Sequence, residues 1–340
     1  MLSSAVLFLV LARVVFVPRA FAQPKHLLLR FFRGLDGYFK RANEKFTGGI
    51  ELVKDTDRLP GDEPIAWRET TKTSLGTFRY LVRVLLAIEI PVVMVCVLIA
   101  IVEASGRLEG ASVTLIVLWI LTTLMVSVKA TSLLSAERSR ETLDVLLTTP
   151  LTAREILKQK FRGVQRLIIV LWIPLLTIIL FEAFWLASTG GSYYGNYYNY
   201  NSDRETGLGI YLTCSVLTLA VYLPMVAYVS LLIGLLVKSQ ARAIIASLAV
   251  IVGWCVLPFL ALIPFVIAVN PGYQSGFNFL LLFSPATIIP VNEFREMNMF
   301  AQTPWVAVIM NFFIYGTILI AVRLFCLMNA DKHLGRGEDW

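Results

Sequence analysis

Six long apolar runs limit what this 340-residue chain can fold into more than any other feature. A helix needs ~20 mostly apolar residues to cross ~30 Å of hydrocarbon, and each run reaches that length. The hydrophobic fraction of the chain is 57% and the charged fraction 16%, against about 25% charged in soluble domains. The sequence therefore predicts an all-α polytopic membrane protein, and excludes a soluble enzyme, a disordered chain and a disulfide-stapled domain. The predicted spans cover residues 82–102, 111–134, 166–187, 208–237, 243–269 and 304–328.

A seventh, weaker apolar run covers residues 2–22 and is interrupted by Arg13. Its end, Ala20-Phe21-Ala22, fits the A-x-A pattern of a signal-peptide cleavage site. No positive charge precedes the run, however, and cleavage would place a strongly basic segment outside the membrane. We therefore expect an extra N-terminal transmembrane helix with its N-terminus outside.

The basic residues are distributed unequally between the loops. Residues 18–81 hold twelve Lys and Arg, and residues 135–165 hold six. The loops on the other side hold one each, at Arg107, Arg204 and Arg295. Since cytoplasmic loops collect Lys and Arg, we expect both basic segments and the C-terminus to be cytoplasmic. We attribute the net charge of +7 to this topology and expect no nucleic-acid partner.

No linker, repeat or low-complexity tract divides the chain. We expect the N-terminal helix at 1–22, a basic cytoplasmic extension at 23–63, one transmembrane domain at 64–328 and a cytoplasmic tail at 329–340. We expect such a chain in a bacterial cytoplasmic (inner) membrane.

Residues 64–83 show a helical pattern directly before the first clear span. At ~100° per residue, Trp67 and Phe78 fall in one apolar arc, and Arg68 and Lys72 fall in an adjoining basic arc. This pattern predicts a helix in the membrane interface, with its apolar side toward lipid and its basic side at the phosphates. A plain juxtamembrane anchor and an elbow helix that transmits motion to the bundle both fit it.

The loop between the second and third clear spans is predicted to contain two helices. The first covers 137–149 and ends there because the residue before Pro150 avoids the α region. Thr152 and Glu155 form a capping box that begins the next helix. Such a short helix, held away from the membrane, is a natural docking element for a soluble partner; a solvated loop is the alternative. Its small apolar face consists of three leucines: Leu143, Leu146 and Leu147.

Two segments of the chain resemble a known family, the ABC-2-type transporter permeases. Residues 137–151, ERSRETLDVLLTTPL, resemble its signature, roughly E-x-E-x-G-T-L-E-x-L-L-x-x-P-L. An E-I-hydrophobic stretch at Glu155 and a lysine, Lys160, follow as in the family. Residues 64–69, PIAWRE, resemble the family's P-x-x-W-R-E helix before its first span. The resemblance covers about 64–328.

Two positions depart from the family's pattern. Ser139 stands where the family has its second acidic residue, and Glu141 stands where it has a glycine before Thr-Leu. These departures bear on the contact geometry of the loop and leave the position of the motif unchanged.

The resemblance implies a six-helix bundle of the type V exporter kind, with residues 2–22 added at its N-terminus. Two such subunits, as a homodimer or as a heterodimer with a second permease, would form the translocation path in the membrane lipid. A separate ABC ATP-binding subunit would dock on a coupling loop at 135–163, through Glu137, Arg138, Arg140, Glu141, Leu143, Asp144, Leu146, Leu147 and Pro150. The implied elbow-helix residues are Trp67, Arg68, Glu69, Lys72 and Phe78. A re-entrant outer hairpin is implied at Phe283, Ser284, Pro285 and Pro290.

The chain shows no site for chemistry of its own. It contains no G-x-x-x-x-G-K-[ST] phosphate-binding loop, so ATP and Mg²⁺ are expected on the partner subunit and no cofactor on this chain. No paired carboxylates or Ser/His/Asp arrangement indicate an enzyme. The four cysteines lie in apolar runs without CxxC spacing, and the two histidines, His26 and His333, lie far apart, so no metal site is expected.

One ionisable residue, Glu89, lies deep in a predicted span, two residues before Pro91. Charges inside a membrane are often functional. A functional role and a local partner, either Arg83 or a neighbouring helix, are the two interpretations.

The sequence therefore predicts the permease subunit of an ATP-driven ABC-2-type exporter, with no substrate indicated. The alternative, from a different class, is a non-transporting membrane scaffold that recruits soluble partners through its basic cytoplasmic face. A secondary transporter would need inverted repeats with interrupted helices, and the sequence has no convincing internal symmetry.

Overall fold

Every secondary-structure element in the described part of the chain is an α-helix. The computed structural model describes residues 61, 63–71, 78–102, 109–139, 141–188, 204–269, 284–293 and 304–334. The predictions for the N-terminal helix, for most of the basic extension and for the end of the tail lie outside these residues. So do the predictions for Lys72, Arg140 and Phe283, and for the side chain of Phe78.

Six of the described helices are long and apolar enough to cross a membrane, which confirms the six predicted spans. The chain is a multi-pass membrane protein with an all-helical bundle. Its long helices are α4 (Phe78–Val102), α5 (Glu109–Ser139), α7 (Ala153–Ser188), α8 (Arg204–Leu236), α9 (Gln240–Val269) and α13 (Pro304–Met328). Four short helices accompany them: α3 (Pro64–Thr71), α6 (Leu143–Leu147), α11 (Pro285–Glu293) and α14 (Ala330–Leu334).

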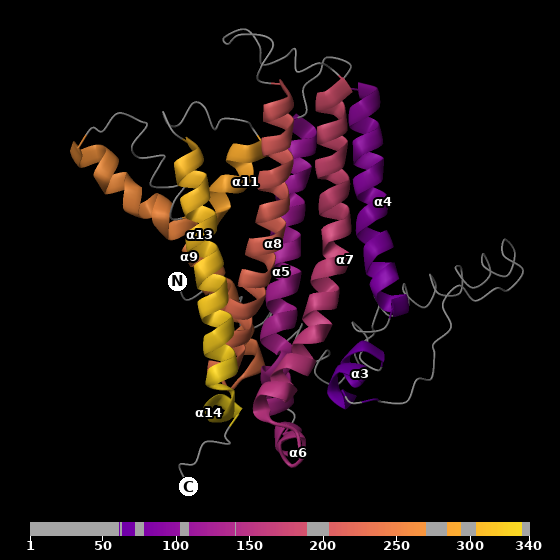
Figure 1. Ribbon diagram of the computed structural model, residues 1–340, viewed down its shortest axis with the longest axis vertical. Helices are drawn as coiled ribbons and strands as arrows, with labels where there is room; N and C mark the ends of the chain where they lie inside the picture. The colour runs from indigo at the N-terminus through magenta and orange to yellow at the C-terminus, as the bar shows by residue number, and fades with distance from the viewer. Residues whose placement is uncertain are drawn as a thin grey trace, which may run out of the picture. The chain divides into compact units, whose positions relative to one another are not determined.

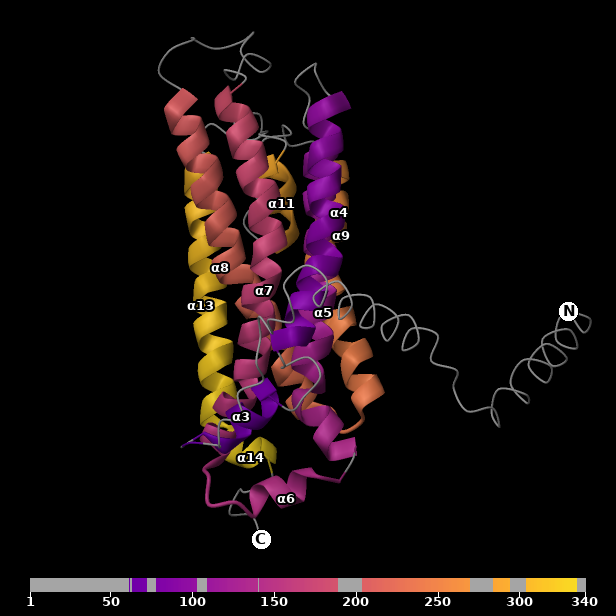
Figure 2. The ribbon, with the colours of Figure 1, turned by 90° about the vertical axis from the view of Figure 1, so that its right-hand side faces the viewer.

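Three long helices, α5, α7 and α8, form the centre of the bundle. In each of these three helices about half of the membrane-crossing stretch is buried, whereas the buried share is 17% in α4 and α13 and 11% in α9. α4 packs on α7, α13 packs on α8, and α9 packs on α5 and α8. α3, α6 and α14 lie at one end of the bundle, the α6 end, and α11 lies toward the other, the α11 end (Figures 1 and 2).

The central helices α5 and α8 approach each other closely at Gly234. A Cβ added there would lie 2.4 Å from the backbone oxygen of Thr131, so only glycine fits. Small residues at membrane helix interfaces allow this approach. One to two turns further along, the buried hydroxyls of Ser127 and Ser230 are 3.1 Å apart, and those of Ser127 and Ser247 are 2.8 Å apart. This serine triad joins α5, α8 and α9 at a single level.

Two central helices extend beyond their apolar runs at the α6 end. α7 begins at Ala153, because the predicted capping box forms directly before it. The Thr152 backbone N–H donates to Glu155 Oε2 at 2.9 Å, and the Glu155 N–H donates to Thr152 Oγ1 at 3.3 Å, which confirms that prediction. α5 continues to Ser139. The bundle therefore has helical extensions onto which α3 and α6 pack.

Candidate functional site

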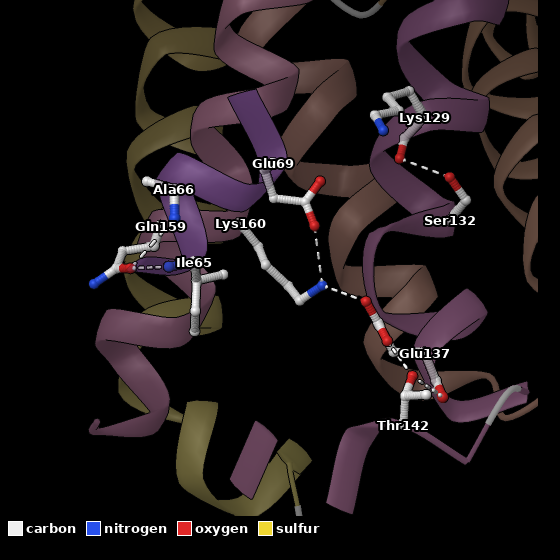
Figure 3. Close-up of polar contacts among 9 residues, drawn as sticks. All are labelled: Ile65, Ala66, Glu69, Lys129, Ser132, Glu137, Thr142, Gln159 and Lys160. Carbon is white, nitrogen blue, oxygen red and sulfur yellow. Dashed lines mark hydrogen bonds and ion pairs between the residues drawn. The ribbon is translucent and has the colours of Figure 1, made fainter. Parts of the chain in front are cut away.

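A buried ionic cluster lies at the α6 end, where three segments of the chain meet around Lys160 of α7. The Lys160 ammonium lies 3.3 Å from Glu69 Oε1 in α3 and 2.8 Å from Glu137 Oε1 in α5 (Figure 3). The side chains are 2%, 8% and 16% exposed, in that order. The cluster thus joins residues 91 and 23 positions apart in the sequence.

Lys160 is buried because it lies on the apolar face of α7. It follows Ile156 by four positions and Leu157 by three, and both are fully buried. Residues at these spacings share one face of a helix. An ammonium buried without a partner would cost several kcal/mol, so the carboxylates of Glu69 and Glu137 offset that cost. The position of α3 on the bundle and the end of α5 are therefore coupled through one cation.

The short helix α3 is capped by a side chain of α7. The Gln159 amide oxygen accepts hydrogen bonds from the backbone N–H groups of Ile65 and Ala66, at 3.1 and 3.4 Å (Figure 3). These donors have no partner within α3, because the first turn of a helix leaves its N–H groups unsatisfied. Pro64 opens α3, where its missing N–H costs nothing. Arg162, one turn further along α7, pairs with Glu63 and adds an exposed second link.

The end of α5 has the geometry of a Schellman motif. The Thr142 N–H donates to the Glu137 carbonyl at 3.1 Å, and the Glu141 N–H donates to the Arg138 carbonyl at 3.2 Å. Glu141 has φ of 58°, the left-handed conformation that favours glycine. The Thr142 hydroxyl also donates to the Glu137 carboxylate. The chain thus turns sharply between α5 and α6, and the continuous helix predicted over 137–149 is wrong in this respect.

The apolar face predicted for α6 is turned toward the bundle. Leu143 and Leu146 are each 8% exposed, and Leu147 is half-buried. Leu146 packs against Ile65 of α3 and Ile156 of α7. These leucines therefore hold α6 in place on the two helices that carry the ionic cluster.

The outward face of α6 is small, with an apolar residue at its centre and acidic residues around it. Val145 is 69% exposed, although it is β-branched and apolar, and no sequence pattern singles it out. Asp144 beside it is exposed, as are Glu141 before the helix and Pro150 after it. We call these four residues the α6 tip.

Arg138, one of the predicted coupling residues, connects helices within the chain. Its guanidinium donates to the Leu235 carbonyl at 2.6 Å and to the His333 carbonyl. These carbonyls lie in the last turns of α8 and α14, where a helix leaves its C=O groups unsatisfied. Burial lowers the pKa of His333, and the charges of Arg138 and Lys332 lower it further. Arg138 thus holds the C-terminal helix α14 against the bundle.

Lys129 adds a second cation near the ionic cluster. It lies about two turns before Glu137 in α5, and its charged neighbours are Glu69 and Lys160. Lys129 is half-buried, and its ammonium has no hydrogen bond or ion pair within the described residues. Two lysines therefore balance the two carboxylates at this end of the bundle.

Three residues of the predicted elbow helix lie in α3, and they lie on different sides of that helix. Glu69 is buried in the cluster, Trp67 is half-buried, and Arg68 is exposed. The face of α3 that packs on α7 carries Ile65, Ala66 and Glu69, which differs from the arc of Trp67 used in the sequence prediction. The contacts between α3 and α7 therefore decide which face of α3 is turned toward the bundle.

The residues of the predicted outer hairpin that the structure describes lie at the α11 end. Ser284 and Pro285 are buried, and Pro290 is half-buried within α11. The Ser284 hydroxyl donates to the Cys255 carbonyl of α9 at 3.2 Å. α11 packs against α8, α5, α9 and α13.

Polar side chains attach α11 to α7 and α8. The Tyr211 hydroxyl of α8 lies 2.9 Å from Glu182 Oε2 of α7 and 3.3 Å from Glu293 Oε2 of α11. The Asn292 amide donates to the Ser215 hydroxyl at 2.9 Å. All five side chains are buried. Only the fold brings these groups together, because they lie on three separate helices.

Glu89 has a local partner on a neighbouring helix. The Thr177 hydroxyl of α7 donates to Glu89 Oε1 at 2.7 Å, and the other carboxylate oxygen is buried without a hydrogen bond in the described part of the chain. Of the two local partners considered, this geometry favours a neighbouring helix over Arg83.

Lys160 belongs to the predicted motif but was given no role there, and Gln159 was not predicted. One signal was present: Lys160 falls on the apolar stripe of α7, where a charged residue needs a partner. Nothing in the sequence near Gln159 indicates that its amide caps a helix more than 90 positions away.

Comparison with known proteins does not identify a family. No protein-family model matches the chain, and no curated protein sequence matches it significantly. Among the described residues, no group of three or more His, Cys, Asp or Glu is arranged to hold a metal ion.

Proposed function

We propose that this chain is the membrane-spanning subunit of an ATP-driven ABC-2-type transporter that exports its substrate. The observation that carries the proposal is the meeting of Lys160 with Glu69 and Glu137. Each of these three charged residues lies in a part of the chain that resembles the family: Glu69 in residues 64–69, Glu137 in residues 137–151, and Lys160 shortly after them. These segments are distant in sequence, and a shared buried cluster gives all three positions one physical role.

That role is to transmit a displacement of α6 to the bundle. α6 connects to α5 through the tight turn at Glu141 and to α7 through the Pro150 break, and Leu146 packs it against α3. The cluster around Lys160 then ties α3, α5 and α7 together within one helical turn of that junction. Packed elements of this kind shift as units rather than bending continuously. A push on α6 would therefore reach two central helices and α3 simultaneously.

The α6 tip is the surface to which the ATP-binding subunit would dock. Its exposed Val145 is flanked by two carboxylates, those of Glu141 and Asp144. A small apolar pocket with basic residues at its rim would complement it, since charge complementarity sets partner choice and encounter rate. On the positive-inside argument, this end of the bundle is cytoplasmic, where ATP is available.

In this proposal ATP is bound and hydrolysed by the partner chain, and two membrane subunits form the path. The second subunit is either another copy of this chain or a related permease, and both arrangements would put one α6 tip against each ATP-binding subunit. Closure of the two partners around ATP would switch the paired bundles between inward-open and outward-open states.

Docking is tested by co-purification of the full chain with the ATP-binding subunit from the same cell membrane. Asp144→Lys and Val145→Asp change the exposed tip and touch no buried contact, so we expect both to fold normally and to lose the partner. Lys158→Met is the matched control, since Lys158 is exposed on α7 outside the tip. We expect it to retain the partner.

Two results would contradict the proposal. One is that no ATP-binding protein accompanies the wild-type chain. The other is that both tip variants retain the ATP-binding subunit at the wild-type level, which would exclude α6 as its docking element.

A further inference from the structure

A cavity of about 470 Å³ lies between four helices toward the α11 end of the bundle. This volume is within the ~300–1,000 Å³ range of pockets that bind small ligands. The lining residues come from one face each of α5, α8 and α9 and from α11. On each long helix they recur at helical spacing, so the cavity is a gap between the helices themselves.

The serine triad and α11 bound the cavity at its two ends. Ser127, Ser230 and Ser247 follow or precede lining residues by one to three positions on α5, α8 and α9. The hydroxyl contacts bring the three helices together there, and beyond that level α9 diverges from the bundle toward the α11 end (Figure 1). Pro285 and Ala286 of α11 line the opposite end.

The cavity opens on the side of the bundle, at the level of the membrane-crossing stretches of its helices. Three of its lining residues, Ile120, Leu124 and Val252, are 56%, 39% and 56% exposed. All three lie in stretches long and apolar enough to span a membrane. In the single chain the opening therefore lies on a surface that bilayer hydrocarbon would contact, and an acyl chain could enter from there without crossing water.

No lining residue of the cavity carries a charge. Three aromatic residues, Trp119, Tyr222 and Trp254, contribute broad apolar surfaces. The Tyr222 hydroxyl is already satisfied by Asn311, 2.5 Å away, so the ligand need not supply a polar partner for it. This lining excludes a charged headgroup and favours flexible hydrocarbon.

We propose that the cavity binds an acyl chain of a lipid-like amphiphile, whose polar headgroup stays outside the cavity. The lateral opening, the absence of charge and the volume all agree with this occupant. Its use as the substrate site rests on the proposed function, whereas acyl-chain binding does not. The protein would thus select substrates by a hydrocarbon chain taken directly from the membrane.

The test is photolabelling of the full chain in nanodiscs by a phosphatidylcholine with a diazirine in its acyl chain. Two variants fill the cavity from different helices: Ala286→Phe on α11 and Thr123→Phe on α5. The control, Val93→Phe, adds the same bulk to α4, where Val93 is 44% exposed and outside the cavity. Labelled peptides are mapped by mass spectrometry, and an excess of unlabelled lipid competes.

We expect saturable labelling concentrated on the α5, α8 and α9 peptides that line the cavity. Each cavity-filling variant should lower the labelling of these peptides to the level found on α4, and Val93→Phe should leave their labelling unchanged. Labelling that is equal on all lipid-facing helices, or unchanged in both filled variants, would overturn the proposal. So would a change in oligomeric state in both filled variants without specific labelling, because a second copy of the chain would then cover the cavity.

The transporter proposal and the acyl-chain proposal can be rejected independently of each other. Specific labelling of a chain that recruits no ATP-binding subunit would retain the cavity assignment and reject the transporter. Recruitment without specific labelling would retain the transporter and reject the acyl-chain site.

Discussion

The Lys160 ammonium of α7 lies 2.8 Å from the Glu137 carboxylate of α5, at the point where α5 ends and the chain turns into α6. Glu137 contributes its backbone carbonyl to that turn as well, through the Thr142 N–H. One residue therefore fixes both the turn and the buried ion pair.

Replacing Lys160 with Met should destabilise the protein by about 3 kcal/mol, because two carboxylates would lose the cation between them. The measurement is the thermal midpoint of the purified chain in detergent. Lys158→Met is the control, since Lys158 is exposed two positions away, and it should change stability by less than ~0.5 kcal/mol. Equal midpoints for the two variants would contradict the assignment of a buried cluster.

The same cluster predicts non-additivity. Glu137→Gln combined with Lys160→Met should cost less than the sum of the two single changes, because contacting charges are coupled. A double-mutant cycle on the same midpoints measures the coupling. Strict additivity would mean that the two side chains do not interact in the folded protein.

Glu141→Gly should stabilise the protein by about 1 kcal/mol. Glu141 has φ of 58°, a conformation that costs a residue with a side chain ~1–2 kcal/mol and costs glycine nothing. Ser139→Gly is the matched control on the last turn of α5, and a right-handed helix should lose ~0.5–1 kcal/mol there. If both glycines destabilise to the same extent, the left-handed turn is absent.

Gly234→Ala should destabilise the bundle by about 2 kcal/mol, because its Cβ would lie 2.4 Å from the Thr131 backbone oxygen and force α5 and α8 apart. Gly209→Ala, on the same helix α8, meets nothing within 4 Å and should be neutral or slightly stabilising. Resistance to unfolding by a denaturing detergent compares the pair. A neutral Gly234→Ala would show that the two helices are further apart.

His333 should make the docking of α14 sensitive to acid. Its pKa is lowered in the folded protein by burial and by Arg138 and Lys332, so the unfolded chain takes up the proton more readily. Stability should therefore be complete above the ordinary histidine pKa of ~6.5 and should fall as the pH falls below it. Thermal midpoints between pH 5 and 8 should show this slope in wild type.

The slope should become shallower in His333→Gln and remain in His26→Gln, which removes the chain's other histidine. An unchanged slope in His333→Gln would assign the acid sensitivity to other groups.

The spans were predictable because each depends only on local composition, and the bilayer sets a minimum length that few other patterns meet. The capping box at Thr152 and Glu155 was predictable for the same reason: its hydrogen bonds join residues three positions apart.

The cluster was not predictable, because its contacts join α3, α5 and α7 over long separations. The motif residues Glu69, Glu137 and Lys160 could be recognised individually, but their meeting depends on how α3 lies on α7. That placement depends on Gln159, whose role as a cap is invisible until the fold is known. Likewise Val145 became the centre of the α6 tip only because the neighbouring leucines are turned inward.

The most direct test of the account is the ATP hydrolysis rate of the chain reconstituted with the ATP-binding subunit that co-purifies with it. Lys160→Met and Lys158→Met are compared with wild type below the unfolding temperature of all three. The account predicts that both variants bind the ATP-binding subunit, that Lys158→Met hydrolyses ATP like wild type, and that Lys160→Met falls to the rate of the ATP-binding subunit alone. Wild-type hydrolysis by Lys160→Met would contradict the claim that the buried cluster couples α6 to the bundle.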